Sequence, residues 1–89
     1  MNNKKILEIK SKILEFSDRI YWDDMVYQIY TRKELKKELD KNNIDRLLSY
    51  FDEMINVCNV FKNENEDDME RYDAIIKDID LYKNSLKVW

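Results

Sequence analysis

The chain of 89 residues contains no glycine and no proline, whereas average usage would supply roughly six and four of them. The tight turns of β-hairpins depend on residues such as glycine that adopt a positive φ at little cost. Sheet proteins rarely do without both residues. Because leucine, lysine, glutamate, isoleucine, aspartate and asparagine are abundant, we expect an all-α protein whose turns contain asparagine and aspartate.

Histidine is also absent, and Cys58 is the only cysteine. Ser-His and Cys-His catalytic pairs and His-based metal sites are therefore excluded. The adjacent carboxylates Asp23/Asp24 and Asp67/Asp68 project about 100° apart on a helix, so neither pair converges on one proton or metal ion. We expect no enzyme activity, no cofactor and no metal site, and we expect Cys58 to be a small buried side chain.

Long apolar runs are missing as well. None approaches the roughly 20 residues of a transmembrane helix, and Glu8, Lys10 and Lys12 interrupt the segment where a signal peptide would be apolar. A lone cysteine fits a reducing compartment, so we expect a cytoplasmic protein without membrane contact. The wealth of lysine, isoleucine and asparagine is typical of AT-rich bacterial or phage genomes.

Apolar residues recur at alternating spacings of three and four over most of the chain, which is the pattern of amphipathic helices. We expect a single domain, 1–89, folded as a compact bundle of about four helices, the second short or broken. The expected ranges are 4–21, 23–30 with 32–41, 43–61 and 66–88, with the polar stretch 63–68 as a linker. The three long stripes are Ile6, Ile9, Ile13, Phe16 and Ile20; Ile44, Leu47, Phe51, Met54, Cys58 and Phe61; and Tyr72, Ile75, Ile79, Tyr82, Leu86 and Trp89.

The second element carries the signals of two helix starts. Asp23 is well placed as an N-cap for a short helix that ends near residue 30. Thr31 and Glu34 then have the spacing of a capping box, in which each side chain satisfies a free backbone N–H group of the other residue. These signals predict a break before a further helix at 32–41.

Helical phase also favours this break. Trp22, Val26 and Ile29 form one stripe, with Met25 beside it, and the continuation of that stripe misses Leu35 and Leu39 by about 120°. A single kinked helix through both parts is the alternative.

The aromatic residues of this segment are the candidate binding site. If the stripe of Trp22, Val26 and Ile29 faces the bundle, Tyr27 projects elsewhere and Tyr30 lies at the border. Tyrosine and tryptophan are enriched at interface hot spots, although burial of the short helix among the long ones would make these residues core instead. The candidate protein-binding residues are Tyr21, Trp22, Tyr27 and Tyr30.

A basic flank on the next helix provides an alternative site for nucleic acid. A short helix followed by a turn and a second basic helix is the order of a helix-turn-helix. Three acidic residues interleave with the basic ones, and the net charge of −3 is not that of a generic polyanion binder. The residues of this alternative site are Arg32, Lys33, Lys36 and Lys37.

The absence of a catalytic set and the presence of an aromatic-rich short helix favour a binding function. We expect a small protein that binds a macromolecular partner, most plainly another protein, as inhibitors, antitoxins, immunity proteins and mobile-element accessory factors do. A nucleic-acid-binding regulator and a self-associating structural subunit, such as a homodimer, are the alternatives.

Overall fold

The computed structural model describes residues 3–86, and every regular element in that range is helical. The four long elements are α1 (Asn3–Ile20), α2 (Arg32–Lys41), α3 (Ile44–Glu64) and α4 (Met69–Leu86). A π-helical turn, η1 (Tyr27–Thr31), leads into α2, and a 3₁₀ turn, η2 (Glu66–Asp68), leads into α4. The predicted all-α bundle of about four helices is confirmed. The predicted packing of Trp89 and the end of the last helix at 88 fall outside the described residues.

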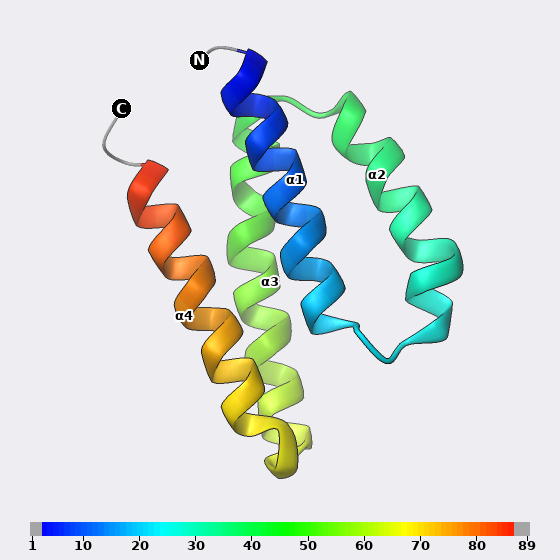
Figure 1. Ribbon diagram of the computed structural model, residues 1–89, viewed down its shortest axis with the longest axis vertical. Helices are drawn as coiled ribbons and strands as arrows, with labels where there is room; N and C mark the ends of the chain where they lie inside the picture. The colour runs from blue at the N-terminus through cyan, green and yellow to red at the C-terminus, as the bar shows by residue number, and fades with distance from the viewer. Residues whose placement is uncertain (1–2, 87–89) are drawn as a thin grey trace.

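Three helices form the body of the molecule and the fourth stands at its side. Helices α1, α3 and α4 lie next to one another, whereas α2 flanks α1 on the side away from α4 (Figure 1). The molecule measures 40 × 30 × 15 Å, so its shortest dimension is little more than one helix diameter of about 10–12 Å. Helix α2 therefore contacts the body on one side and leaves its other side to solvent.

The predicted stripes of α1, α3 and α4 meet in one core. Ile9, Ile13, Phe51 and Ile79 are completely buried, and the rings of Phe16 and Phe51 meet edge to face with centroids 6.3 Å apart. Burying such side chains provides most of the favourable free energy of folding. From α2, only Leu39 joins this cluster of buried residues.

Two connections can be compared with the prediction, the one before α3 and the one between α3 and α4, and the second differs from it. Asn43 caps α3 by accepting a hydrogen bond from the backbone N–H of Arg46 at 2.9 Å, in line with the expectation that turns contain asparagine. The predicted linker at 63–68 is wrong in part, because α3 continues to Glu64 and η2 begins two residues later. Polar residues at the end of the stripe did not stop the helix, since exposed positions of a helix accept them at small cost.

The predicted break in the second element is wrong. Residues 25–41 are helical without interruption, and Thr31 has helical dihedral angles (φ −66°, ψ −40°) with no capping hydrogen bond from its side chain. The N-cap is Asp24 and not Asp23, because Asp24 Oδ1 accepts a hydrogen bond from the backbone N–H of Tyr27 at 3.0 Å. The alternative of a single helix is the one that the structure adopts.

The π-helical turn explains why the phase of the sequence was misleading. At about 100° per residue, Leu35 would lie about 80° away from Tyr27 around an α-helix. A π turn closes its hydrogen bonds over five residues and so accommodates one extra residue. Across η1, Tyr27 is thereby brought to the same side as Leu35 and Leu39, and all three side chains are fully or partly buried.

Candidate functional site

Tyr27 is buried between α1 and the helix that carries it, with an exposed fraction of only 3%. Its hydroxyl donates a hydrogen bond to Asp18 Oδ1 at 3.0 Å, and its ring stacks on Tyr21 with centroids 4.8 Å apart. Burial, with a further contribution from the Asp18 carboxylate, raises the pKa of Tyr27 well above its usual value. As a binding residue that projects away from the bundle, Tyr27 is contradicted; it is a core residue, which was the other interpretation of these aromatic side chains.

Arg32 is anchored at the same carboxylate. Its Nε–H group donates to Asp18 Oδ1 at 3.0 Å and to Oδ2 at 3.2 Å. Asp18 near the end of α1 therefore holds both Tyr27 and Arg32, which lie on one side of the second helix. This network fixes the rotation of that helix, and it engages the guanidinium that the nucleic-acid alternative would use.

Two of the other three aromatic candidates, Tyr21 and Trp22, are also placed by contacts within the molecule. Tyr21 is partly buried, and its ring meets Phe61 edge to face at 5.7 Å; burial is the main cause of its raised pKa. Trp22 remains 57% exposed, and the guanidinium of Arg71 on α4 lies 5.6 Å from its ring. Trp22 therefore lies toward α4, away from the solvent side of the second helix.

The solvent side of that helix is apolar at its beginning. Met25, Val26, Ile29 and Tyr30 have exposed fractions between 54% and 71%, and we call these four side chains the outer face. Residues four apart are neighbours on a helix surface, so Met25 lies beside Ile29 and Val26 beside Tyr30. The stripe that we expected to face the bundle faces water instead, because the Asp18 network turns Tyr27 inward.

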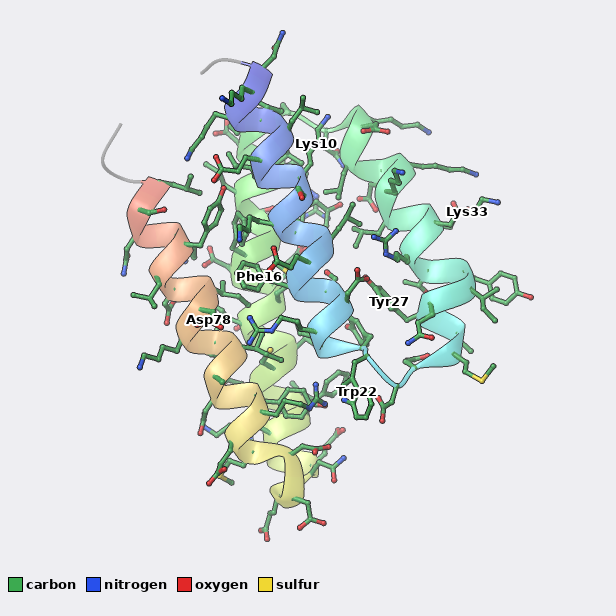
Figure 2. The ribbon with its side chains drawn as sticks, viewed as in Figure 1. Lys10, Phe16, Trp22, Tyr27, Lys33 and Asp78 are labelled. Carbon is green, nitrogen blue, oxygen red and sulfur yellow. The ribbon has the colours of Figure 1, made fainter. Side chains whose placement is uncertain are left out.

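Figure 2 shows this division of the helix, with Tyr27 directed toward α1 and Lys33 extending from the opposite side. Of the four aromatic candidates, only Tyr30 belongs to the outer face. No signal in the sequence marked Met25, Val26 and Ile29 as surface residues, because apolar residues in a helical stripe are normally buried.

Basic residues follow the outer face along the helix. Lys33, Lys36 and Lys37 are all exposed, and Lys37 lies 3.6 Å from the carboxylate of Glu34. Within residues 3–86, neither Lys33 nor Lys36 takes part in an ion pair. Glu34 lies four residues beyond Tyr30 and pairs with Lys37, so the surface that continues the outer face carries both signs of charge, with an excess of positive charge.

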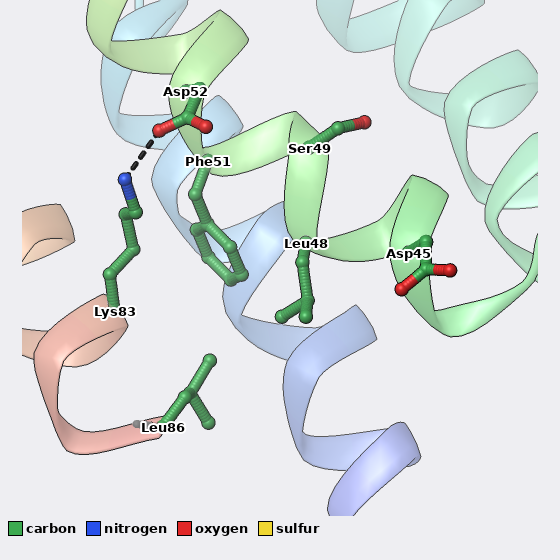
Figure 3. A pocket seen from close by; sticks show the side chains of 7 residues that line it. All are labelled: Asp45, Leu48, Ser49, Phe51, Asp52, Lys83 and Leu86. Atoms are coloured by element: carbon green, nitrogen blue, oxygen red, sulfur yellow. Dashed lines mark hydrogen bonds and ion pairs between the residues drawn. The ribbon is translucent and has the colours of Figure 1, made fainter.

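A pocket of about 370 Å³ lies between α3 and α4 (Figure 3). Leu48, Phe51 and Leu86 form its apolar wall, and the ammonium group of Lys83 donates to the carboxylate of Asp52 at its edge. The two charged groups satisfy each other. Asp45 also lines the pocket and forms no ion pair in the part of the chain that the structure describes, so the pocket combines apolar surface with one free carboxylate.

Cys58 does not have the surroundings of a reactive thiol. It is completely buried on α3, as predicted, and burial raises the pKa of its thiol to about 11, although Arg71 and Arg19 act in the opposite direction. A thiol rather than a thiolate is a poor nucleophile. In the part of the chain that the structure describes, no three His, Cys, Asp or Glu side chains are grouped so that they could hold a metal ion.

Comparison with protein families, with curated proteins and with solved structures finds no match to this chain. Among residues 3–86, no helix combines the length and the apolar character that crossing a membrane requires. Fold and geometry alone therefore have to carry any functional conclusion.

Proposed function

We propose that this protein acts by binding another protein through its outer face. The observation that carries the proposal is the exposure of Met25, Val26, Ile29 and Tyr30 side by side on one helix. Single exposed apolar side chains are normal on a protein surface, whereas contiguous patches mark interaction sites. Four such side chains present on the order of 500 Å² of apolar surface, which is near the upper end for the largest patch of a monomer.

The rotation of the helix supports the proposal, because it is held by specific contacts. Turning the outer face inward would bury four apolar side chains, yet it would expose Tyr27 and separate Arg32 from Asp18, with which it makes two hydrogen bonds. The side chains of Arg32 and Asp18 are 41% and 42% exposed, so their pair contributes about 1 kcal/mol, and burial of the Tyr27 ring adds to it. The outer face is thus displayed by a defined arrangement and is not the result of a loosely attached helix.

The proposal includes the setting inferred from the sequence. A protein of this size that binds one partner in the cytoplasm fits the roles of inhibitor, antitoxin, immunity protein or phage accessory factor. None of these roles requires a catalytic group or a cofactor, and the proposal assigns none.

Nucleic-acid binding is a second candidate, favoured by the exposed ammonium groups of Lys33 and Lys36, which have no ion-pair partner among the described residues. It has less support, because Arg32 is engaged by Asp18 and the net charge is −3. Binding of labelled duplex DNA at low salt tests it. Affinity should fall steeply with salt and on neutralising both lysines if the candidate is right; no binding at low salt excludes it.

The proposed function is tested by affinity capture from the native host with two matched variants. Ile29→Asp places a charge in the middle of the outer face. The control, Leu81→Asp, places the same charge outside the outer face, at a leucine of α4 that is 59% exposed. We expect Ile29→Asp to lose proteins that both the unmodified chain and Leu81→Asp retain. Equal capture by all three proteins contradicts the proposal.

A further inference from the structure

We infer that the protein that covers the outer face is a second copy of this chain, packed antiparallel about a two-fold axis. The inference rests on the proposed function, because it names the partner of that same surface. It is drawn from the position of the apolar side chains, from the charges at the two ends of the outer face and from the area that a dimer would bury.

The apolar side chains lie in two neighbouring rows. Met25, Ile29 and Lys33 follow one another at intervals of four on the side opposite Tyr27, and Val26 and Tyr30 form the adjacent row. Around a two-fold axis, the same patch meets itself. With the axis near the middle of the outer face, Met25 and Val26 of one copy meet Ile29 and Tyr30 of the other.

Charge changes sign across the outer face. Asp23 and Asp24 precede it, and Lys33 and Lys36 follow it. Asp23, which also lines a hollow with Phe61 and Tyr72, stands two residues before Met25, and Lys33 stands three residues after Tyr30. Neither Asp23 nor Lys33 takes part in an ion pair within residues 3–86. An antiparallel contact between two copies places the acidic end of each beside the basic end of the other, so that each pair occurs twice.

This change of sign favours a second copy over partners of uniform charge. A uniformly acidic partner would meet Asp23 and Asp24 at one end of the face, and a uniformly basic partner would meet Lys33 and Lys36 at the other end. Like charges brought together at an interface oppose association. The chain itself has the required pattern, with opposite charges at the two ends.

The size of the outer face is also suitable. Its apolar area, on the order of 500 Å², together with a polar rim of Asp23, Lys33 and their neighbours approaches the roughly 800 Å² that each partner contributes to a standard interface. Because the buried area per partner stays below this standard value, we expect a reversible dimer whose population depends on protein concentration. Dimerisation should therefore be visible at micromolar and higher protein concentration.

Sedimentation equilibrium of the full chain from low to high micromolar concentration tests the inference first. We expect a monomer–dimer equilibrium that Ile29→Asp abolishes and Leu81→Asp leaves unchanged, with both variants folded by circular dichroism. A monomer at every concentration, or a dimer that Ile29→Asp does not affect, overturns it.

Charge reversal then tests the antiparallel arrangement. Asp23→Lys alone and Lys33→Glu alone should each raise the dissociation constant of the dimer about tenfold, because each breaks two pairs and creates two repulsive ones. The double variant should restore the original dissociation constant. The matched control reverses Asp80 and Lys77, two exposed residues of α4 that form no ion pair in the described residues, and should change nothing. If the dissociation constant of the double variant Asp23→Lys/Lys33→Glu is higher than that of either single variant, the antiparallel arrangement of the dimer is contradicted.

The outcomes also separate this inference from the proposed function. If the chain is monomeric but captures another protein that Ile29→Asp fails to capture, the inference of a second copy is wrong and the protein-binding function stands. If the chain is monomeric and Ile29→Asp captures the same proteins as the unmodified chain, both are wrong.

Discussion

The two tyrosines of the second helix make the sharpest prediction, because Tyr27 and Tyr30 are three residues apart and have opposite surroundings. Tyr27 is 3% exposed and Tyr30 is 67% exposed. We expect Tyr27→Ala to lower the free energy of unfolding by about 3–5 kcal/mol, the range for truncating a buried aromatic side chain. Tyr30→Ala should change it by less than about 0.5 kcal/mol, as is usual for surface positions.

The loss of stability in Tyr27→Ala can be divided into a contribution from the hydroxyl and one from the ring. Tyr27→Phe keeps the ring stacked on Tyr21 and removes only the hydrogen bond to Asp18. Since Asp18 retains both hydrogen bonds from Arg32, the carboxylate is not left without a partner, and we expect a loss of about 1–2 kcal/mol. The remainder of the Tyr27→Ala effect comes from the ring itself.

Urea unfolding followed by far-ultraviolet circular dichroism measures all three variants. The slope of the free energy against urea should be unchanged, which shows that the same surface is exposed on unfolding. Equal destabilisation by Tyr27→Ala and Tyr30→Ala, or a larger effect of Tyr30→Ala, would refute the assigned rotation of the helix and with it the outer face.

Three further predictions concern stability. The pKa of Cys58 is raised from 9.0 to about 11 in the folded protein, so the unfolded chain releases the thiol proton first and stability falls as pH rises from about 9 to 11. The loss of stability attributable to Cys58 is roughly 2–3 kcal/mol. This loss should disappear in Cys58→Ala when unfolding is measured across the same pH range. Asp24→Ala removes the N-cap and should cost about 1 kcal/mol in urea unfolding, whereas an equal cost for Asp23→Ala would contradict the assigned cap. Arg32→Ala should cost about 1 kcal/mol and lose protection of the amides at 25–31 in hydrogen exchange; unchanged protection there would mean that Asp18 does not hold the helix.

The sequence was sufficient for the three long helices because their stripes are regular. Ile9, Ile13 and Phe16 on α1 and Ile75 and Ile79 on α4 keep the three-four spacing throughout, and all are buried. Burial of such a stripe is the dominant stabilising contribution to a helix in a small bundle. Periodicity and burial therefore agree wherever the backbone remains an α-helix.

The second helix was mispredicted because its backbone departs from that assumption. Phase at a fixed angle per residue cannot anticipate a π turn, and the turn at Tyr27–Thr31 reverses which stripe faces inward. The capping-box residues Thr31 and Glu34 are present in the sequence, yet the helix continues through them. Tertiary contacts are the physical reason, since Tyr27 is held against α1 before the supposed break and Arg32 and Leu39 are held after it.

The candidate site changed for the same reason. The sequence indicated the segment around 22–30 as the candidate site, but the rotation of the helix decides which of its side chains reach solvent. Tyr27 and Tyr21 form internal contacts, whereas Ile29 and Tyr30 are exposed. A hydrogen bond between residues as far apart as Asp18 and Arg32 cannot be derived from local patterns, and this contact sets the rotation.

Photo-crosslinking at position 30 tests directly whether the outer face binds another protein chain. A photoreactive phenylalanine analogue replaces Tyr30 on the outer face or, as a control, Leu81 on α4, and the chain is irradiated in its native host. We expect a covalent adduct with another protein chain, a second copy included, from position 30 and none from position 81. No adduct at position 30, or the same adducts from both positions, would contradict it.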